Sequence, residues 1–264
     1  MLVRSDLAEQ GAEGLVRASS YRAVQPMHAR LAVVDVHLDA GAGSERIDQL
    51  LFGEAFDVLD RRPGPDGSDQ AWGRARRDGV VGWVDRAGLA PGAPLATHRV
   101  ASTDAALPLN ALVHHSLSGV ALEDLAPVGL FETDLAAVAE RLLRTPHSLG
   151  ARSSRATDCS GLVQQALYAC GLAGPRHSDQ QALLGQAVEP ASARRGDIVV
   201  WLNPGQMSGE GRSWTGHSAL MFAADQVIHA TGHHGLVTIE SLAAADARYR
   251  DDGFDAPLFR RITL

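Results

Sequence analysis

The sequence has only two cysteines and no long run of apolar residues. Cys159 and Cys170 fall in one predicted helix, where a rise of about 1.5 Å per residue puts them about 16 Å apart. A disulfide needs Cα atoms within about 7 Å. We therefore expect two separate, reduced thiols, as is usual in a reducing compartment. Two cysteines without clustered spacing also give no zinc signature.

Basic residues are in the minority. The chain has 24 Lys and Arg against 31 Asp and Glu, a formal net charge of −7. Nucleic acids and anionic membranes favour basic patches, so this balance argues against both as partners. The first ten residues lack the apolar run of a secretory signal, and no segment has the length needed to span a bilayer. We expect a cytoplasmic protein, unless a leader preceded this sequence.

Short predicted strands dominate the N-terminal part of the chain. Apolar or alternating runs, each bounded by Gly, Pro or Asp, occur at 32–38, 55–59, 72–76 and 80–84. Strands at this spacing predict a small barrel. The order of Leu51-Phe-Gly-Glu-Ala-Phe, Trp72 and the hairpin Asp78-Gly-Val-Val-Gly-Trp-Val84 resembles a bacterial SH3-like barrel. We expect both tryptophans of these motifs to belong to the barrel core rather than to a peptide-binding face.

The regions on either side of the barrel are less regular. We predict a lead-in without regular structure at 1–27, the barrel at 28–90, and a linker with a truncated second SH3-like unit at 91–128. About thirty residues are too few to bury an independent core, so we expect the last of these to pack on its neighbours. Residues 129–264 form the predicted main domain.

The segment 157–171 predicts a buried helix that begins at Cys159. Its apolar residues recur at helical spacing, Asp158 is placed to cap the first turn, and Gly171 marks the end. Free first-turn N–H groups and the helix dipole favour a thiolate at Cys159. A lone buried cysteine is nevertheless more often a small hydrophobe than a nucleophile, so the prediction needs a histidine partner.

The surrounding elements predict an α+β domain. An amphipathic helix is expected at 133–144 with Thr133 as its cap, a short helix near 180–186, and a Gly- and Ser-rich loop at 203–216. Strands are predicted after the turn that precedes Asp197, at 197–202, 217–222, 227–230 and 236–240. The second and third of them contain His217 and His229. Helix first and antiparallel sheet afterwards is an α+β order.

Two histidines on neighbouring predicted strands supply the missing partner. A cysteine nucleophile needs a base, and the base needs a group that orients it. His217 and His229 lie directly opposite each other if the hairpin pairs symmetrically about Ala223. A two-residue turn at Ala224-Asp225 would instead put them on opposite faces. The hypothesis therefore requires an odd-length connection.

Five motifs in this order resemble the NlpC family of papain-like bacterial cysteine peptidases. They are Asp158-Cys-Ser-Gly-Leu-Val163, Pro175-Arg-x-Ser-x-x-Gln181, Arg195-Gly-Asp-Ile-Val199, Gly216-His217 and Ile228-His-Ala230. The resemblance implies a papain-like catalytic domain after the barrel. It also implies that Cys159 is the nucleophile, His217 the base, and His229 the residue that orients the His217 ring.

With the barrel in front, the chain is similar to cytoplasmic γ-D-glutamyl-L-diamino acid endopeptidases that recycle cell-wall peptides. This implies hydrolysis of the γ-D-Glu–diamino acid bond in short peptidoglycan-derived peptides with a free N-terminal L-Ala. Residues that would bind the substrate are Asp158, Ser160, Ser178 and, in the barrel, Glu54. The barrel would close one end of the groove. No metal, organic cofactor or protein partner is implied.

The loop before the nucleophile departs from the family pattern. It is usually Tyr-x-Trp-Gly-Gly, and here it is His147-Ser-Leu-Gly-Ala151. The tyrosine position normally helps to hold the oxyanion and the substrate. His147 can donate a hydrogen bond there too, but imidazole titrates near neutrality. Two alternatives stay open: a murein-peptide-binding protein with weakened activity, and an amidase or acyltransferase with the same triad. The sequence does not specify the diamino acid or the oligomeric state.

Overall fold

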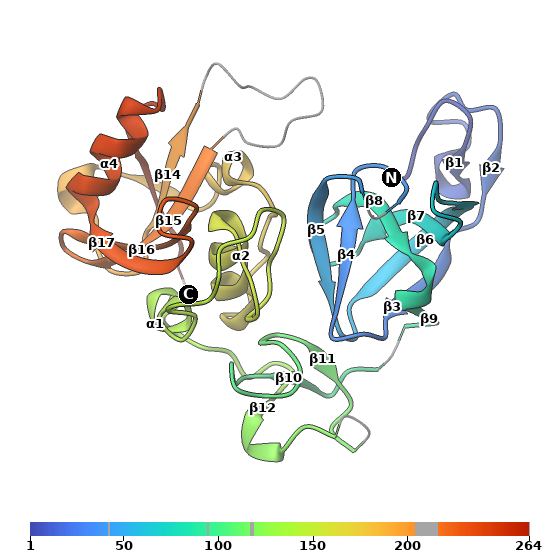
Figure 1. The fold of residues 1–264 in the computed structure, drawn as a ribbon, viewed down its shortest axis with the longest axis horizontal. Coiled ribbons are helices and arrows are strands. Elements are labelled where there is room, and N and C mark those ends of the chain that lie inside the picture. The colour runs from blue at the N-terminus through green and yellow to red at the C-terminus, as the bar shows by residue number, and fades with distance from the viewer. Residues whose placement is uncertain (42, 94, 117–118, 204–215, 264) are drawn as a thin grey trace. The chain divides into compact units, whose positions relative to one another are not determined.

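In the computed structural model the chain folds into two units, Met1–Val128 and Gly129–Leu264 (Figure 1). The structure describes residues 1–41, 43–93, 95–116, 119–203 and 216–263. Most of the loop predicted at 203–216 therefore lies outside the described residues. None of the helices in the described part combines the length and apolar composition needed to cross a membrane.

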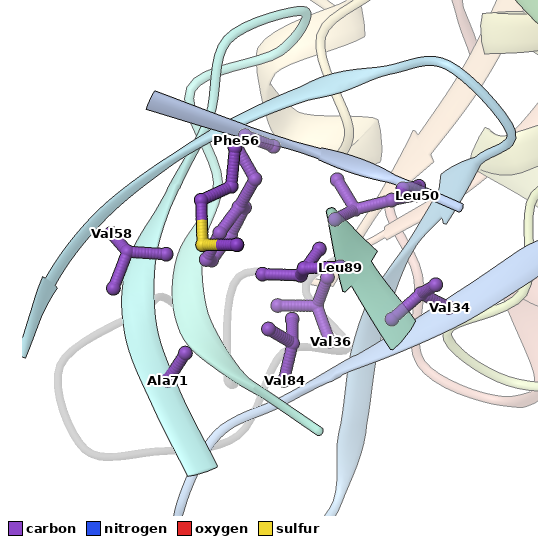
Figure 2. Packing of buried hydrophobic residues seen from close by; sticks show 11 residues of the cluster. Val34, Val36, Leu50, Phe56, Val58, Ala71, Val84 and Leu89 are labelled. Carbon is purple, nitrogen blue, oxygen red and sulfur yellow. The ribbon is translucent and has the colours of Figure 1, made fainter. Parts of the chain in front are cut away.

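The first unit contains a seven-stranded antiparallel sheet in the order β5-β4-β8-β7-β6-β3-β9. The strands are β3 (Gln25–Ala29), β4 (Val33–His37), β5 (Arg46–Leu51), β6 (Ala55–Pro63), β7 (Asp69–Ala75), β8 (Val81–Asp85) and β9 (Leu89–Pro91). The alternation predicted for β4 is confirmed, because Val34 and Val36 point into a core with Leu50 and Phe56 (Figure 2). The sheet begins at Gln25, three residues before the predicted boundary.

The N-terminal segment is more ordered than the predicted lead-in. Its short strands β1 (Ala8–Glu9) and β2 (Tyr21–Arg22) pair in parallel. Leu2 and Leu7 pack with Leu59 and both tryptophans of the SH3-like motifs, Trp72 and Trp83, which are 7% and 5% exposed. The prediction that these tryptophans are core residues is confirmed, and the N-terminal segment itself contributes to their burial.

Residues 95–128 of the first unit form a small antiparallel sheet in the order β11-β10-β12. Its strands are β10 (His98–Val100), β11 (Leu112–Val113) and β12 (Leu125–Pro127). Val100, Ala111 and Val113 share one buried cluster with Leu51 at the end of β5. As expected for so short a piece, its buried apolar side chains pack with residues of the barrel, whereas Leu95, Leu122 and Val128 are exposed.

The second unit is a six-stranded antiparallel sheet with helices packed on it, and its α+β class is confirmed. The strand order is β13-β18-β14-β15-β16-β17. In chain order the elements are α1 (Leu135–Glu140), α2 (Cys159–Ala169), α3 (Ser178–Gln181), β13 (Gln186–Val188), β14 (Ile198–Leu202), β15 (Gly216–Ala223), β16 (Gln226–Thr231), β17 (Leu236–Ser241), α4 (Leu242–Asp251) and β18 (Leu258–Arg261). Ala219 and Met221 of β15 pack with Ala245 and Tyr249 of α4.

Several predicted boundaries in this unit were wrong. The first helix begins at Leu135 with Asp134, not Thr133, as the cap, because the Asp134 carboxylate accepts the Ala137 N–H. It also ends at Glu140, four residues early. The short helix α3 begins two residues before the predicted range 180–186 and ends five residues before the end of that range. The elements α4, β13 and β18 were not predicted from the sequence.

The start of α2 is set by Asp158 and Gly161. The Asp158 carboxylate accepts the Gly161 N–H at 2.8 Å, which caps the first turn as predicted. A Cβ on Gly161 would lie 2.5 Å from the Ala151 carbonyl oxygen. The helix can therefore pack directly on the preceding loop only because residue 161 has no side chain. All eleven residues of α2 are buried, and Gly171 ends the helix with φ of 76°.

Candidate active site

Cys159, His217 and His147 line one cavity of about 540 Å³ in the second unit, together with Tyr249 and Phe254. Cys159 is the first residue of α2, His217 lies on β15, and His147 lies in the loop before α2. The cysteine sulfur is 3.8 Å from the Ser178 hydroxyl, at the first residue of α3. The predicted nucleophile and base are thus brought together although 58 residues separate them in the sequence.

The hairpin that carries the two histidines is not the predicted one. Its turn is the two-residue Ala224-Asp225, but a register shift between Met221 and Ala223 adds one residue to β15. Leu220 pairs with Ile228. When this register is continued along β15, Thr231 lies opposite His217, and His229 is two residues from Thr231. Residues two apart on a strand share a face. The bulge therefore restores the common face that the turn alone would remove.

The two histidines are joined in a hydrogen-bonded chain that continues to β17. His217 Nε2 lies 2.8 Å from His229 Nδ1, and His229 Nε2 lies 2.6 Å from Glu240 Oε1. Arg248 of α4 donates to both oxygens of Glu240. Tyr249 stacks on the His217 ring with centroids 4.2 Å apart. The ring of His217 is thus held at Nε2 by His229 and over its face by Tyr249, and the orienting role of His229 in catalysis stays a prediction.

Burial governs the protonation of the cysteine and its base. Burial, and next the Asp158 carboxylate, raise the pKa of Cys159, while hydrogen bonds from the Ser218 backbone and Ser178 oppose this. Burial, then His229 and His147, hold the pKa of His217 well below its usual value. The neutral thiol and neutral imidazole are therefore the favoured resting forms. This differs from the thiolate expected from the helix start alone.

Asp158 is part of a buried ion pair. Arg176 donates to both of its oxygens, at 3.0 and 2.6 Å, and the Gly150 and Gly161 N–H groups donate as well. Burial alone would raise the pKa of Asp158, but the Arg176 charge keeps it below its usual range. Ser160 donates to Asp158 and accepts from Arg176. Both residues therefore stabilise the start of α2, and a bond from Asp158 to a substrate ammonium stays a prediction.

The other predicted binding residues are spread over the two units. Ser178 is beside the cysteine sulfur, and His147 is half-buried at the cavity. Burial lowers the pKa of His147, so its neutral form predominates at neutral pH. Glu54 belongs to the first unit, where it is 1% exposed, pairs with Arg77 and accepts the Leu51 N–H. A contact of Glu54 with substrate stays a prediction.

Comparison with known proteins identifies both parts of the chain. Residues 144–251 match the model of the NlpC/P60 family, and residues 38–89 match the bacterial dipeptidyl-peptidase SH3 domain. The chain carries an NlpC/P60 domain. The match includes Cys159, His217, His229 and Glu240, so the family assignment and the cavity geometry concern the same residues.

Two relatives extend this assignment. The peptidoglycan endopeptidase RipB of Mycobacterium tuberculosis, found in two strains, is 36% identical over 88 residues, a third of this chain and a third of RipB. The crystal structure of an NlpC/P60 family protein from Bacillus cereus matches 89% of this chain and 99% of its own, with a TM-score of 0.70 and 14% identity. At that identity the likeness shows the fold alone.

Three residues of the NlpC/P60 domain site were missed from the sequence: Glu240, Arg248 and Tyr249. The available signal for Glu240 was a carboxylate at the end of the apolar pattern of β17. Glu240 is two residues from Thr238, which lies opposite His229. Arg248 and Tyr249 lie on α4, whose alanine-rich start has no apolar stripe. Within the described residues, no group of three His, Cys, Asp or Glu side chains has the arrangement of a metal site.

Proposed function

We propose that this protein is a cysteine endopeptidase that hydrolyses peptides derived from peptidoglycan. The single observation that carries the proposal is the arrangement of Cys159 and His217 at one cavity, with His217 held by its hydrogen bond to the buried His229. A nucleophile beside a base that is oriented by a third group is the general requirement for acyl transfer through a covalent intermediate. The partial match to RipB, a peptidoglycan endopeptidase, supports this substrate class.

The proposed reaction begins with a neutral thiol and a neutral imidazole. As Cys159 Sγ attacks the scissile carbonyl carbon, His217 accepts the thiol proton at Nδ1, since its Nε2 is occupied by His229. The negative charge that develops on the carbonyl oxygen would be stabilised by the free N–H groups at the start of α2 and by His147. His217 then gives the proton to the leaving amine, and the carbon–nitrogen bond breaks to leave a thioester.

The second half of the reaction uses the same groups. His217 takes a proton from water, the resulting hydroxyl attacks the thioester carbonyl, and the carbon–sulfur bond breaks. The products are a free carboxylic acid and the regenerated Cys159 thiol. Burial of His217 supports this role, because a base must be unprotonated at the working pH.

We further propose that the bond cleaved lies between γ-D-Glu and a diamino acid, in short peptides with a free N-terminal L-Ala. The order of an SH3-like barrel and an NlpC/P60 domain supports this choice. In this proposal Ser178, beside the thiol, contributes to peptide binding, and Glu54 supplies an acidic group from the barrel. The cytoplasm is the proposed compartment, where recycled peptides of this size would be met.

The test is a mass-spectrometric assay with L-Ala-γ-D-Glu-meso-diaminopimelate, using the full chain and Cys159→Ala. We expect L-Ala-D-Glu and free diaminopimelate from the wild type, and loss of at least about 10³-fold in kcat from the variant. Cys170→Ala is the matched control, since Cys170 is the other cysteine of the chain and lies at the opposite end of α2. Tight binding of uncleaved tripeptide would contradict hydrolysis and favour a binding protein, whereas cleavage of acetylmuramyl-amide or lipid substrates alone would favour an amidase or acyltransferase.

A further inference from the structure

Glu240 links the histidine chain to a fixed positive charge. Its carboxylate is 13% exposed and accepts hydrogen bonds from two sides. His229 Nε2 lies 2.6 Å from Oε1, and Arg248 approaches both oxygens, with Nη1 3.1 Å from Oε2. None of these groups touches the thiol. Glu240 lies behind His229 in the hydrogen-bonded chain, whereas Arg248 also lines the cavity that holds Cys159.

The proton positions along this chain follow from the inventory of donors and acceptors. An ionised carboxylate only accepts, so Nε2 of His229 must carry the hydrogen in its bond to Glu240. A neutral imidazole has a single N–H, which makes Nδ1 of His229 an acceptor. Nε2 of His217, 2.8 Å away, must then be the donor. The remaining nitrogen of His217, Nδ1, is left without a hydrogen and is free to act as a base.

We propose that Glu240 is a positioning residue, which fixes the tautomers of His229 and His217 so that Nδ1 of His217 is unprotonated in the resting enzyme. The inference rests on the proposed function insofar as His217 is the base for Cys159. In this inference Glu240, a residue of β17 outside the Cys159–His217–His229 set, determines which nitrogen of each histidine ring carries the proton. A neutral side chain in place of Glu240 would leave the opposite proton order available, in which His217 presents an N–H to the thiol.

The surroundings of the chain favour this proton order. Burial alone would raise the pKa of Glu240, but hydrogen bonds from His229 and Arg248 lower it to about 2, so the carboxylate is ionised throughout the neutral range. The charged and titratable groups facing His229 are His217, Glu240, Arg248, His234 and, across the cavity, His147. Burial lowers the pKa of His229 despite Glu240, which keeps this ring neutral with a single N–H.

The experiment that tests the inference directly is nitrogen-15 NMR of the histidine rings, which distinguishes Nδ1–H from Nε2–H tautomers without any substrate. For the wild type at pH 7 we expect both His217 and His229 as Nε2–H tautomers. In Glu240→Gln the amide N–H can donate to His229, and we expect a substantial population of Nδ1–H tautomers at both rings. A wild-type His217 found as Nδ1–H would overturn the proposal whether or not the variant folds.

Kinetics on the tripeptide give the second readout. We expect Glu240→Gln to lower kcat by about 10- to 100-fold with KM unchanged, as for other residues that orient a functional group. Glu240→Ala is expected to lose as much and to be partly rescued by added formate. The matched control is Asp246→Asn on α4, which removes a carboxylate bonded to Trp201 outside the histidine chain. Its tautomers and kcat should equal those of the wild type.

The two readouts separate this inference from the proposed function. If the wild type fails to cleave the tripeptide, the substrate proposal fails, while the tautomers still decide the role of Glu240. If Glu240→Gln loses activity with both rings still in the Nε2–H form, Glu240 acts through stability alone and the inference is refuted. A tautomer change accompanied by a fall in kcat supports it.

Discussion

At the scale of single residues, the chemistry of Cys159 depends on burial more than on its place at the start of a helix. The free amides of the first turn favour a thiolate, but a buried sulfur beside the Asp158 carboxylate has a raised pKa. Its base, His217, has a lowered pKa for the same physical reason. The resting pair is therefore neutral, and proton transfer accompanies attack instead of preceding it.

This predicts different pH profiles for alkylation and hydrolysis. Alkylation of Cys159 by iodoacetamide requires the thiolate, so we expect a low rate at pH 7 that still rises above pH 9. Hydrolysis requires only neutral His217, so we expect kcat/KM to stay level from about pH 6.5 to 9 and to fall at lower pH. Mass spectrometry of the Cys159 peptide measures the first profile. An alkylation midpoint below pH 7 would show a preformed ion pair.

A second residue-scale prediction concerns Arg176. Arg176→Met leaves the Asp158 carboxylate buried without its cation, and we expect a loss of about 3–5 kcal/mol in the free energy of unfolding at pH 7. The wild-type pKa of Asp158 is lowered, so the pair stabilises above the unfolded pKa near 3.8 and this contribution is lost as pH falls through the folded value. The deficit of the variant should therefore shrink in acid.

Urea unfolding of both proteins at pH 7 and at about pH 3, below the unfolded pKa, measures this difference. The control is Arg195→Met, which breaks a partly exposed ion pair with Asp134. Pairs of that kind contribute about 0–1 kcal/mol. Equal losses from the two variants would contradict a special role for the buried pair.

At the scale of elements, the nucleophile is positioned by the contact between α2 and the loop before it. Gly161→Ala would put a methyl group 2.5 Å from the Ala151 oxygen and 2.8 Å from Thr157 Oγ1. The helix start must then shift, and we expect a loss of about 1–3 kcal/mol in stability and roughly 100-fold in kcat. Gly11→Ala, with open space around it, should change neither. Thermal unfolding and tripeptide kinetics provide the measurements.

How far the sequence predicted these elements depends on where their signals lie. The helical spacing of apolar residues, the N-cap Asp158 and the terminating Gly171 of α2 all lie within fifteen residues. The position of the helix and the role of Asp158 as its N-cap were therefore predicted. The ion pair of Asp158 with Arg176 was not predicted, because Arg176 approaches from a separate segment that no local pattern connects to Asp158. The substrate role of Asp158 stays a prediction. The two histidines were placed correctly on adjacent strands, but the bulge that brings them to one face is invisible in the hairpin residues.

The helix α4 and the carboxylate of Glu240 were missed for a related reason. Only Ala245 and Tyr249 of α4 are buried, and Leu242-Ala-Ala-Ala has no helical stripe to detect. The contact of Glu240 with His229 depends on the pairing of β16 with β17. In this pairing Val227 lies opposite Glu240, and His229 is two residues further along β16. Tertiary partners of this kind are set by register, and register is the quantity that sequence patterns specify least.

At the scale of the whole molecule, each unit has a buried core of its own. The first unit holds the barrel cluster around Val36 and Phe56, and the second holds the cluster between its sheet and α4 around Trp201 and Tyr249. The second unit also contains Cys159, His217, His229 and Glu240. A chain limited to residues 129–264 should therefore fold cooperatively and keep the histidine tautomers of the full chain.

The proposed role of the barrel in selecting free N-termini makes a prediction for this shortened chain. The full chain should prefer L-Ala-γ-D-Glu-diaminopimelate over its N-acetyl form by at least about 10-fold in kcat/KM, since a buried acidic site that receives an ammonium group rejects a neutral amide. Residues 129–264 alone should cleave the same bond with this preference lost. Full-chain Glu54→Gln, which keeps the barrel, should lower the preference if Glu54 contacts the amine. A shortened chain with the full preference would place the selectivity inside the NlpC/P60 domain and exclude the barrel from substrate choice.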